Sequence, residues 1–357
     1  MGLSSNSYPV DSPLGRVDLL AARAMDCDRE ALAELVADPA LLAAPRFKRA
    51  IPAIALAASE SGLEVPAPWR NDLIGAAVAG MLLKQQLDAV GSVLDAAGIP
   101  WMPIKGMDLG YRLWPGPEAR PTSDLDILVP AARFAEARAF LGEAGWKGLL
   151  NGDEYECFLA SEAYNWEARN DSGILLELHF RLWPSTPPSW AESLWENCID
   201  APDLGSQARR PSWPDAFVLA AVHLWQLPPP HNLVYFRDLE LIARRAGESA
   251  LEEAGASARR WGVSLQVCLA ALYTTHLWPN PAMKHLAESL RSDLYLPERL
   301  LYSRAVARGI DAASIGELWL ARLLSGRKTR HGWRVVLRPL RPHSALRPRR
   351  AAAIRTA

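Results

Sequence analysis

Cysteine is scarce in this chain, and the four cysteines that it has lie far apart, at Cys27, Cys157, Cys198 and Cys268. None forms a Cys-x-x-Cys pair, which argues against a zinc site and against the disulfide framework of a secreted protein. The N-terminus also lacks a basic segment followed by an apolar run, so we expect no signal peptide. Together these absences predict a protein of the reducing cytoplasm.

Long apolar runs without charge are missing as well. No uncharged apolar stretch reaches about 18 residues, the length that a membrane-spanning helix needs, so we expect no membrane partner. Hydrophobic residues still make up 50% of the 357 residues, which is enough for a sizeable core. This length suits two domains, or one domain with a helical extension. The fourteen tryptophans are expected to pack in the core.

Acidic residues are absent from the C-terminal end. From Leu318 onward there are eleven Arg or Lys residues and no Asp or Glu, which leaves about twelve net negative charges on the rest of a chain whose total is −1. An acidic body argues against a general nucleic-acid-binding surface. The basic end contains repeated Arg-Pro pairs and is expected to be a poorly ordered tail. A solvated tail is the favoured interpretation, and contact with an acidic partner or RNA is the alternative.

Two acidic residues lie close together in an apolar, β-prone segment, Asp124-Leu-Asp126-Ile-Leu-Val129. Side chains alternate along a strand, so Asp124 and Asp126 share one face and the apolar residues share the other. Two like charges so close repel each other and are costly to bury unpaired. A divalent cation removes this cost, and Mg²⁺ in particular binds carboxylates together with substrate phosphates. We therefore predict a Mg²⁺ site, with Mn²⁺ as the alternative metal. A solvated polar strand face is the structural alternative.

A second apolar segment carries Glu177 and His179, again two positions apart. If this strand lies beside the first, Glu177 joins Asp124 and Asp126 in a cluster of three carboxylates. Such a cluster can hold two divalent ions. Glu177 could instead pair with an arginine. His179 is open between a supporting or general-base role near the site and a half-buried histidine bonded to a backbone carbonyl.

Three further residues are candidates for binding phosphate. Lys105-Gly106 is expected at a strand-to-helix turn, where glycine permits close backbone approach and a helix N-terminus attracts anions. Lys105 could add a positive charge there, and Arg120 precedes the acidic strand as a second cation. The alternative for Lys105 is a surface lysine at a strand end.

The pattern along the chain predicts an α+β fold. Strands and helices alternate up to about residue 183, which implies a small mixed sheet with helices packed against it. A long helix is expected from a cap at Asn71 to about Ala97. The expected regions are a helical N-terminal region (1–70), a core (71–183), a helical domain (184–325) and the basic tail (326–357). Helices are expected in the third region at 189–199, 213–227, 235–246, 249–261, 263–276 and 296–324.

The order of these motifs resembles a known family. Ile104-Lys105-Gly106, Arg120, Asp124-Leu-Asp126-Ile-Leu-Val and Leu176-Glu177-Leu-His179 are similar to motifs of the uncharacterised bacterial nucleotidyltransferase family in the DNA polymerase β superfamily. The resemblance covers roughly residues 70–245. It implies a minimal nucleotidyltransferase sheet, with Asp124 and Asp126 as metal ligands and Glu177 as the third acid. Lys105-Gly106 stands where the superfamily usually has a Gly-Ser phosphate-binding turn.

The resemblance also implies a reaction. A Mg²⁺-dependent enzyme of this family would transfer NMP from an NTP, such as ATP, to an acceptor and release pyrophosphate. The resemblance implies a small-molecule, peptide or sugar acceptor. No residue of the chain identifies which acceptor or which NTP is used, and none indicates the oligomeric state. One alternative is a non-catalytic binding or scaffold protein that keeps the fold. Another is a polynucleotide-directed enzyme that uses the basic tail.

Overall fold

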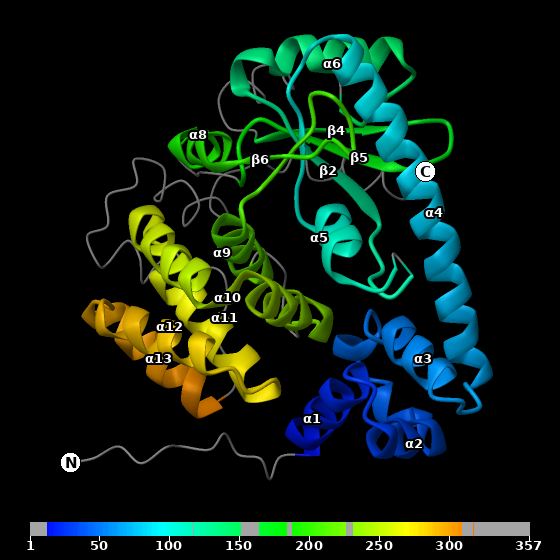
Figure 1. The fold of residues 1–357 in the computed structure, drawn as a ribbon, viewed down its shortest axis with the longest axis vertical. Helices are drawn as coiled ribbons and strands as arrows, with labels where there is room; N and C mark the ends of the chain where they lie inside the picture. Colours follow the sequence, from blue (N-terminus) through cyan, green and yellow to red (C-terminus); the bar gives the residue numbers. More distant parts are fainter. Residues whose placement is uncertain are drawn as a thin grey trace.

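A computed structural model describes residues 13–116, 118–150, 164–183, 188–225, 231–308 and 317 (Figure 1). It is a mixed α+β fold, as the sequence predicts, with a five-stranded sheet and helices before and after it. The expected tail at 326–357 lies outside the described residues. Of the last expected helix, the described part is Leu296–Arg308 together with residue 317.

The N-terminal region is helical. Its elements are α1 (Pro13–Met25), α2 (Arg29–Ala37), the 3₁₀ turns η1 (Pro39–Leu42) and η2 (Pro45–Phe47), and α3 (Ile51–Glu60). Asp28 caps α2, because its carboxylate accepts hydrogen bonds from the backbone N–H groups of residues 30 and 31. Arg46 in η2 pairs with Asp18 in α1 at 3.0 Å, which fixes this turn against the first helix.

Helix α4 (Ala67–Ala96) connects this region to the sheet (Figure 1). The predicted cap at Asn71 is wrong: the helix begins at Ala67, and Pro68 lies in the first turn, where no N–H is needed. The helix packs against α3, and also against α6 (Phe134–Glu143) and strand β2 (Asp124–Leu128). Among the described helices, α4 alone is long and apolar enough to cross a membrane, and 28% of its most apolar window is buried.

The sheet has the strand order β1-β2-β5-β4-β3. Its other strands are β1 (Met102–Pro103), β3 (Lys147–Gly148), β4 (Asn165–Arg169) and β5 (Leu175–His179). Strands β2 and β5 are parallel, whereas the other neighbouring pairs are antiparallel. The two strands that carry the predicted acids are therefore neighbours at the centre of the sheet.

One face of these strands, here called the back side, is apolar. Leu125 and Ile127 of β2 and Leu176 and Leu178 of β5 are fully buried there, in a core that includes residues of α4 and α6. Because side chains alternate, the polar residues of the same strands lie on the opposite face, here called the site side. Helix α5 (Gly106–Leu113) contacts β2 and follows directly after the first strand.

The remainder of the described chain is mainly helical, with a small hairpin of β6 and β7. Its elements are α8 (Pro188–Asn197), β6 (Ile199–Asp200), β7 (Arg209–Arg210), α9 (Trp213–Leu224), α10 (Leu233–Trp261), α11 (Ser264–Leu277), α12 (Pro281–Ser292) and α13 (Leu296–Arg308). The two helices expected at 235–246 and 249–261 are both part of α10, with a kink at Gly247 (φ +79°). Buried residues of the N-terminal helices and of α9 to α13 form one hydrophobic core.

Candidate functional site

The predicted acids meet on the site side of the sheet. In the parallel pairing of β2 with β5, Asp126 lies opposite Glu177. Ligand atoms of Asp126, Glu177 and His179 all lie within 4.8 Å of one another. Asp124, two residues before Asp126 on the same face, lines the same cavity. The structure thus brings together the residues that the two i, i+2 patterns indicated.

Lys105 lies against this cluster. Its Nζ is 2.6 Å from Oδ1 of Asp126, and the two side chains are only 10% and 6% exposed. The residue has a positive φ of 60°, a conformation that side-chain-bearing residues rarely adopt, immediately before α5 begins. The backbone at this turn therefore places the ammonium group beside the acids, and not at the protein surface.

His179 is held by the same acids. Its Nε2 lies 2.9 Å from Oδ1 of Asp126 and 3.3 Å from Oε2 of Glu177, while its Nδ1 is buried without a hydrogen-bond partner among the described residues. The Nδ2 group of Asn165, on the neighbouring strand β4, donates to Oε2 of Glu177 at 3.0 Å. Of the two interpretations left open for His179, this geometry shows contact with the acids and not a bond to a backbone carbonyl.

The electrostatics of the two aspartates differ. Burial raises the pKa of Asp124 to about 7, and the negative charges of Asp126 and Glu177 act in the same direction. Burial also acts to raise the pKa of Asp126. There, however, the charge of Lys105 and the hydrogen bond from His179 prevail and hold the pKa below its ordinary value. Burial acts to lower the pKa of Lys105, but the charges of Asp126 and Glu177 raise it above its usual range. Lys105 is therefore a permanent cation that keeps Asp126 ionised.

Arg120 is bound to the C-terminal helices. Its Nε and Nη2 donate to the two carboxylate oxygens of Asp238 in α10, at 2.8 and 2.7 Å, and both side chains are buried. Trp114 also donates its indole N–H to Asp238, at 2.8 Å. Asp238 thus forms an ion pair with an arginine 118 residues away, which joins the core to the C-terminal half.

Gly106 is required for close packing. A Cβ atom at this position would lie only 2.7 Å from Cγ2 of Thr122. Its carbonyl accepts a hydrogen bond from Nη1 of Arg120 at 3.2 Å. Gly106 is the first residue of α5 and lines the cavity, so the N-terminus of this helix faces the acidic cluster.

The cavity at the acids has a volume of about 280 Å³ and is bordered by three regions of the chain. The core contributes Asp124, Asp126 and Glu177, together with Lys105. Three residues that the sequence analysis did not single out also line it: Arg49 precedes α3, while His223 and Tyr235 belong to α9 and α10. Their types and spacing carry no signal for this role, because they reach the site only through the tertiary fold.

His223 is not the satisfied core histidine that its apolar helix suggests. Its Nδ1 is buried and has no hydrogen-bond partner in the part of the chain that the structure describes, and its ring packs edge-on against Tyr235, with 5.4 Å between ring centroids. Burial lowers the pKa of His223 to about 3, and the positive charges of Lys105, Arg120 and Arg49 act in the same direction. The imidazole is therefore neutral at ordinary pH.

The donor set of the acidic cluster fits a divalent metal ion. It offers two ionisable carboxylates and an imidazole within 4.8 Å of one another, with Asp124 lining the same cavity. Carboxylate oxygens suit Mg²⁺ and Mn²⁺. The acids repel one another, and a cation bound between them would relieve that repulsion as Lys105 does for Asp126.

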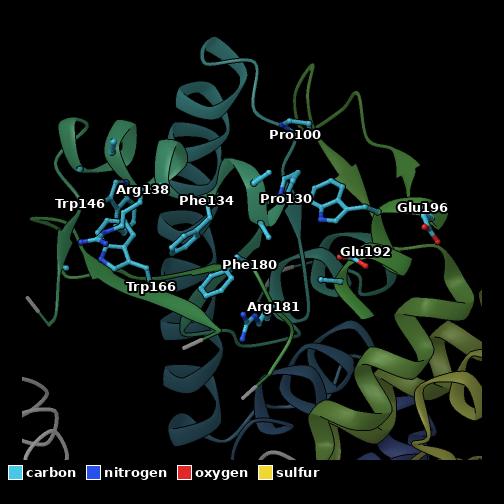
Figure 2. Close-up of a pocket in the computed structure, with 18 residues that line it drawn as sticks. Pro100, Pro130, Phe134, Arg138, Trp146, Trp166, Phe180, Arg181, Glu192 and Glu196 are labelled. Atoms are coloured by element: carbon cyan, nitrogen blue, oxygen red, sulfur yellow. The ribbon is translucent and has the colours of Figure 1, made fainter. Parts of the chain in front are cut away.

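A larger cavity, of about 1230 Å³, lies at the back side of the sheet (Figure 2). Its walls are mostly apolar and aromatic, and Phe134 and Phe180 contact each other there with 4.4 Å between ring centroids. Arg138 lies near the Trp166 ring, 5.7 Å from its centroid. None of the clustered acids lines this cavity. Size therefore does not mark the chemical site, and we place the candidate site at the smaller cavity.

Among solved structures, the fold is similar to that of the antibiotic-resistance factor ANT(2″)-Ia, determined in solution and described as showing substrate-regulated conformation dynamics. Sequence identity is 16%, the match covers 52% of this chain and 95% of that chain, and the TM-score is 0.38. A comparison with curated proteins gives no significant match.

A family model described as "Uncharacterised nucleotidyltransferase" matches residues 37–279. The matched region includes Arg49 and all of α3 to α11 among the described elements, and thus every residue named above as part of the cavity. Family membership makes the protein a transferase enzyme. The chain belongs to the uncharacterised nucleotidyltransferase family.

Proposed function

We propose that this enzyme transfers NMP from an NTP to a hydroxyl or phosphate group of a small-molecule, peptide or sugar acceptor and releases pyrophosphate. The observation that carries the proposal is the pairing of Asp126 with Glu177 across two parallel strands, with Asp124 on the same face and a cavity in front. Acids that repel one another so closely are destabilising unless a cation binds between them, and the proposed reaction uses such a cation.

Asp124, Asp126 and Glu177 would hold the metal, with His179 beside them. When bound, the divalent ion supplies Lewis-acid stabilisation of the phosphate charge and a lowered pKa for the attacking hydroxyl. Lys105 keeps Asp126 ionised through their 2.6 Å contact. Asn165 and His179 orient Glu177. In the reaction, the acceptor oxygen bonds to the α-phosphorus, the bond from that phosphorus to the pyrophosphate oxygen breaks, and pyrophosphate leaves with the electron pair. An acceptor hydroxyl gives its proton to water.

The cavity also supports the choice of an anionic substrate. The positive groups Lys105, Arg120 and Arg49 line it together with the N-terminus of α5, and helix N-termini attract phosphate. The neutral His223 and the hydroxyl of Tyr235 complete the wall without adding charge. Such a mixture of cations and metal-binding acids is suited to a metal-bound triphosphate.

The decisive test replaces both aspartates. For Asp124→Asn with Asp126→Asn we expect pyrophosphate release to fall by roughly a thousandfold or more, because electrostatic stabilisation of the transition state is lost. The assay measures pyrophosphate from each of the four NTPs with Mg²⁺ or Mn²⁺, in the presence of metabolites handled by neighbouring gene products. Asp171→Asn, which removes an exposed carboxylate, is the control. Unchanged release in the double variant would overturn the proposal.

A further inference from the structure

The three cations that line the small cavity are not equivalent. Lys105 is paired with Asp126 at 2.6 Å, and Arg120 is paired with both carboxylate oxygens of Asp238. Their charges are therefore largely compensated within the protein. Arg49, by contrast, forms no ion pair with any residue in the described part of the chain. It is the lining cation whose charge is available to a substrate.

The hydrogen-bond partner of Arg49 is neutral. One of its terminal nitrogens donates to the hydroxyl of Tyr235, across 3.1 Å. A guanidinium group has five N–H donors, so this bond leaves donors for a second partner. Arg49 lines the same cavity as Asp124 and His223, so its guanidinium lies on the side of its segment that borders the acidic cluster.

The backbone around Arg49 is firmly anchored. Phe47 and Ala50, on either side of it, are fully buried, and the ion pair of Arg46 with Asp18 fixes η2. At the other end, Tyr235 is a buried residue of α10. Arg49 is thus held at the wall of the cavity by a hydrogen bond to a residue 186 positions away in sequence.

We propose that Arg49 is a substrate-binding residue that donates to the phosphate oxygens of the bound triphosphate, and that Tyr235 positions it. The planar fork of an arginine suits two phosphate oxygens at once. The N-terminal helical region would then be part of the active site and not only a cover for the core. This inference rests on the proposed function, since it assumes a triphosphate in the cavity.

The test measures phosphate binding without depending on the base. Isothermal titration calorimetry with Mg²⁺ tripolyphosphate compares the full-length wild type with Arg49→Ala, Arg49→Lys and Tyr235→Phe. For Arg49→Ala we expect affinity to fall roughly tenfold to a hundredfold, the usual effect of losing charge-assisted hydrogen bonds. Arg49→Lys should keep part of the affinity, because it retains the charge but loses the fork. Lys48→Ala is the control: this neighbouring side chain is exposed, and its removal changes the net charge equally.

Thermal unfolding of each variant separates binding from a purely structural role. Tyr235→Phe removes the tie between the two regions as Arg49→Ala does, but leaves the guanidinium. We expect Tyr235→Phe to lose much less tripolyphosphate affinity than Arg49→Ala. If both variants lowered the unfolding temperature while tripolyphosphate affinity stayed at the wild-type value, Arg49 would be only a structural tie and the inference would be overturned.

The result for the wild type separates a failure of the proposed function from a failure of the role proposed for Arg49. If the wild type releases pyrophosphate from an NTP and Arg49→Ala binds tripolyphosphate as tightly as the wild type does, the role of Arg49 is wrong and the proposed function stands. If the wild type binds neither tripolyphosphate nor any NTP with Mg²⁺ or Mn²⁺, the proposed function fails, and the role of Arg49 fails with it.

Discussion

The two sides of the central sheet are formed by the same two strands, yet they differ in almost every physical property. On the back side, Ile127 and Leu178 are fully buried among other apolar residues. On the site side, the next residues along the same strands are Asp126, Glu177 and His179, which form a charged cluster. Alternation along a strand is sufficient to produce this contrast.

The difference indicates that stability and chemistry are assigned to opposite faces. Burial of apolar side chains on the back side stabilises the fold. On the site side, buried like charges act against folding, and Lys105 offsets only part of their repulsion. The cavities follow the same division: the larger one is aromatic and lies at the back, whereas the smaller one holds the acids. Substitutions on the back side should therefore lower stability and leave activity unchanged, whereas removal of an acid on the site side should lower activity and raise stability.

The largest stability effect is expected on the back side, for Ile127→Ala. Removing this fully buried side chain leaves a cavity, and the free energy of unfolding should fall by about 2 to 5 kcal/mol. Urea denaturation measures this loss, while pyrophosphate release per folded molecule should remain near the wild-type value. Ile127→Val, a smaller truncation at the same position, should lose only about 0.5 to 1.5 kcal/mol. Loss of activity without loss of stability at this residue would contradict the division between the faces.

A smaller effect of opposite sign is expected on the site side, for Asp124→Asn. This change removes a half-buried carboxyl group whose ionised form is repelled by Asp126 and Glu177, so at pH 8 the free energy of unfolding should rise by about 0.5 to 2 kcal/mol. Pyrophosphate release should be strongly reduced in the same variant. The matched control is Asp171→Asn, at a carboxylate that is 88% exposed, which should change stability by less than about 0.5 kcal/mol. A destabilised Asp124→Asn variant would show that this carboxylate supports the fold.

Local patterns were sufficient to predict the centre of this fold. The i, i+2 spacing of Asp124 with Asp126 and of Glu177 with His179 requires only that each segment be a strand. Their adjacency follows once both strands belong to one small sheet, and the structure has them paired in parallel. The cluster of acids was therefore accessible from the sequence, together with the mixed α+β class.

Contacts between distant segments could not be predicted in this way. The pairs Arg120–Asp238 and Arg49–Tyr235 join residues 118 and 186 positions apart, and no periodicity encodes them. Nor did apolar spacing reveal α12, whose burial depends on its packing against α10 and α11. The start of α4 was misplaced because Asn71 is a good capping residue in isolation, whereas the observed start uses Pro66 and Pro68.

The smallest expected effect concerns His223, and it tests whether the cations of the site side extend their influence to α9. In the folded state its pKa is lowered to about 3 by burial and by the charges of Lys105, Arg120 and Arg49, against an ordinary value of 6.5. As the pH falls below 6.5, the unfolded chain takes up a proton that the folded protein cannot accept, so stability decreases; above 6.5 this residue adds no pH dependence. Between pH 8 and pH 6, the free energy of unfolding should fall further in the wild type than in His223→Gln, and the difference should be below about 1 kcal/mol.

A second measurement follows the His223 imidazole directly: its NMR signals should show no titration from about pH 8 to 5. A midpoint near 6.5 in the folded protein would show that the cluster of cations does not reach this residue, and that its ring is solvated in the cavity.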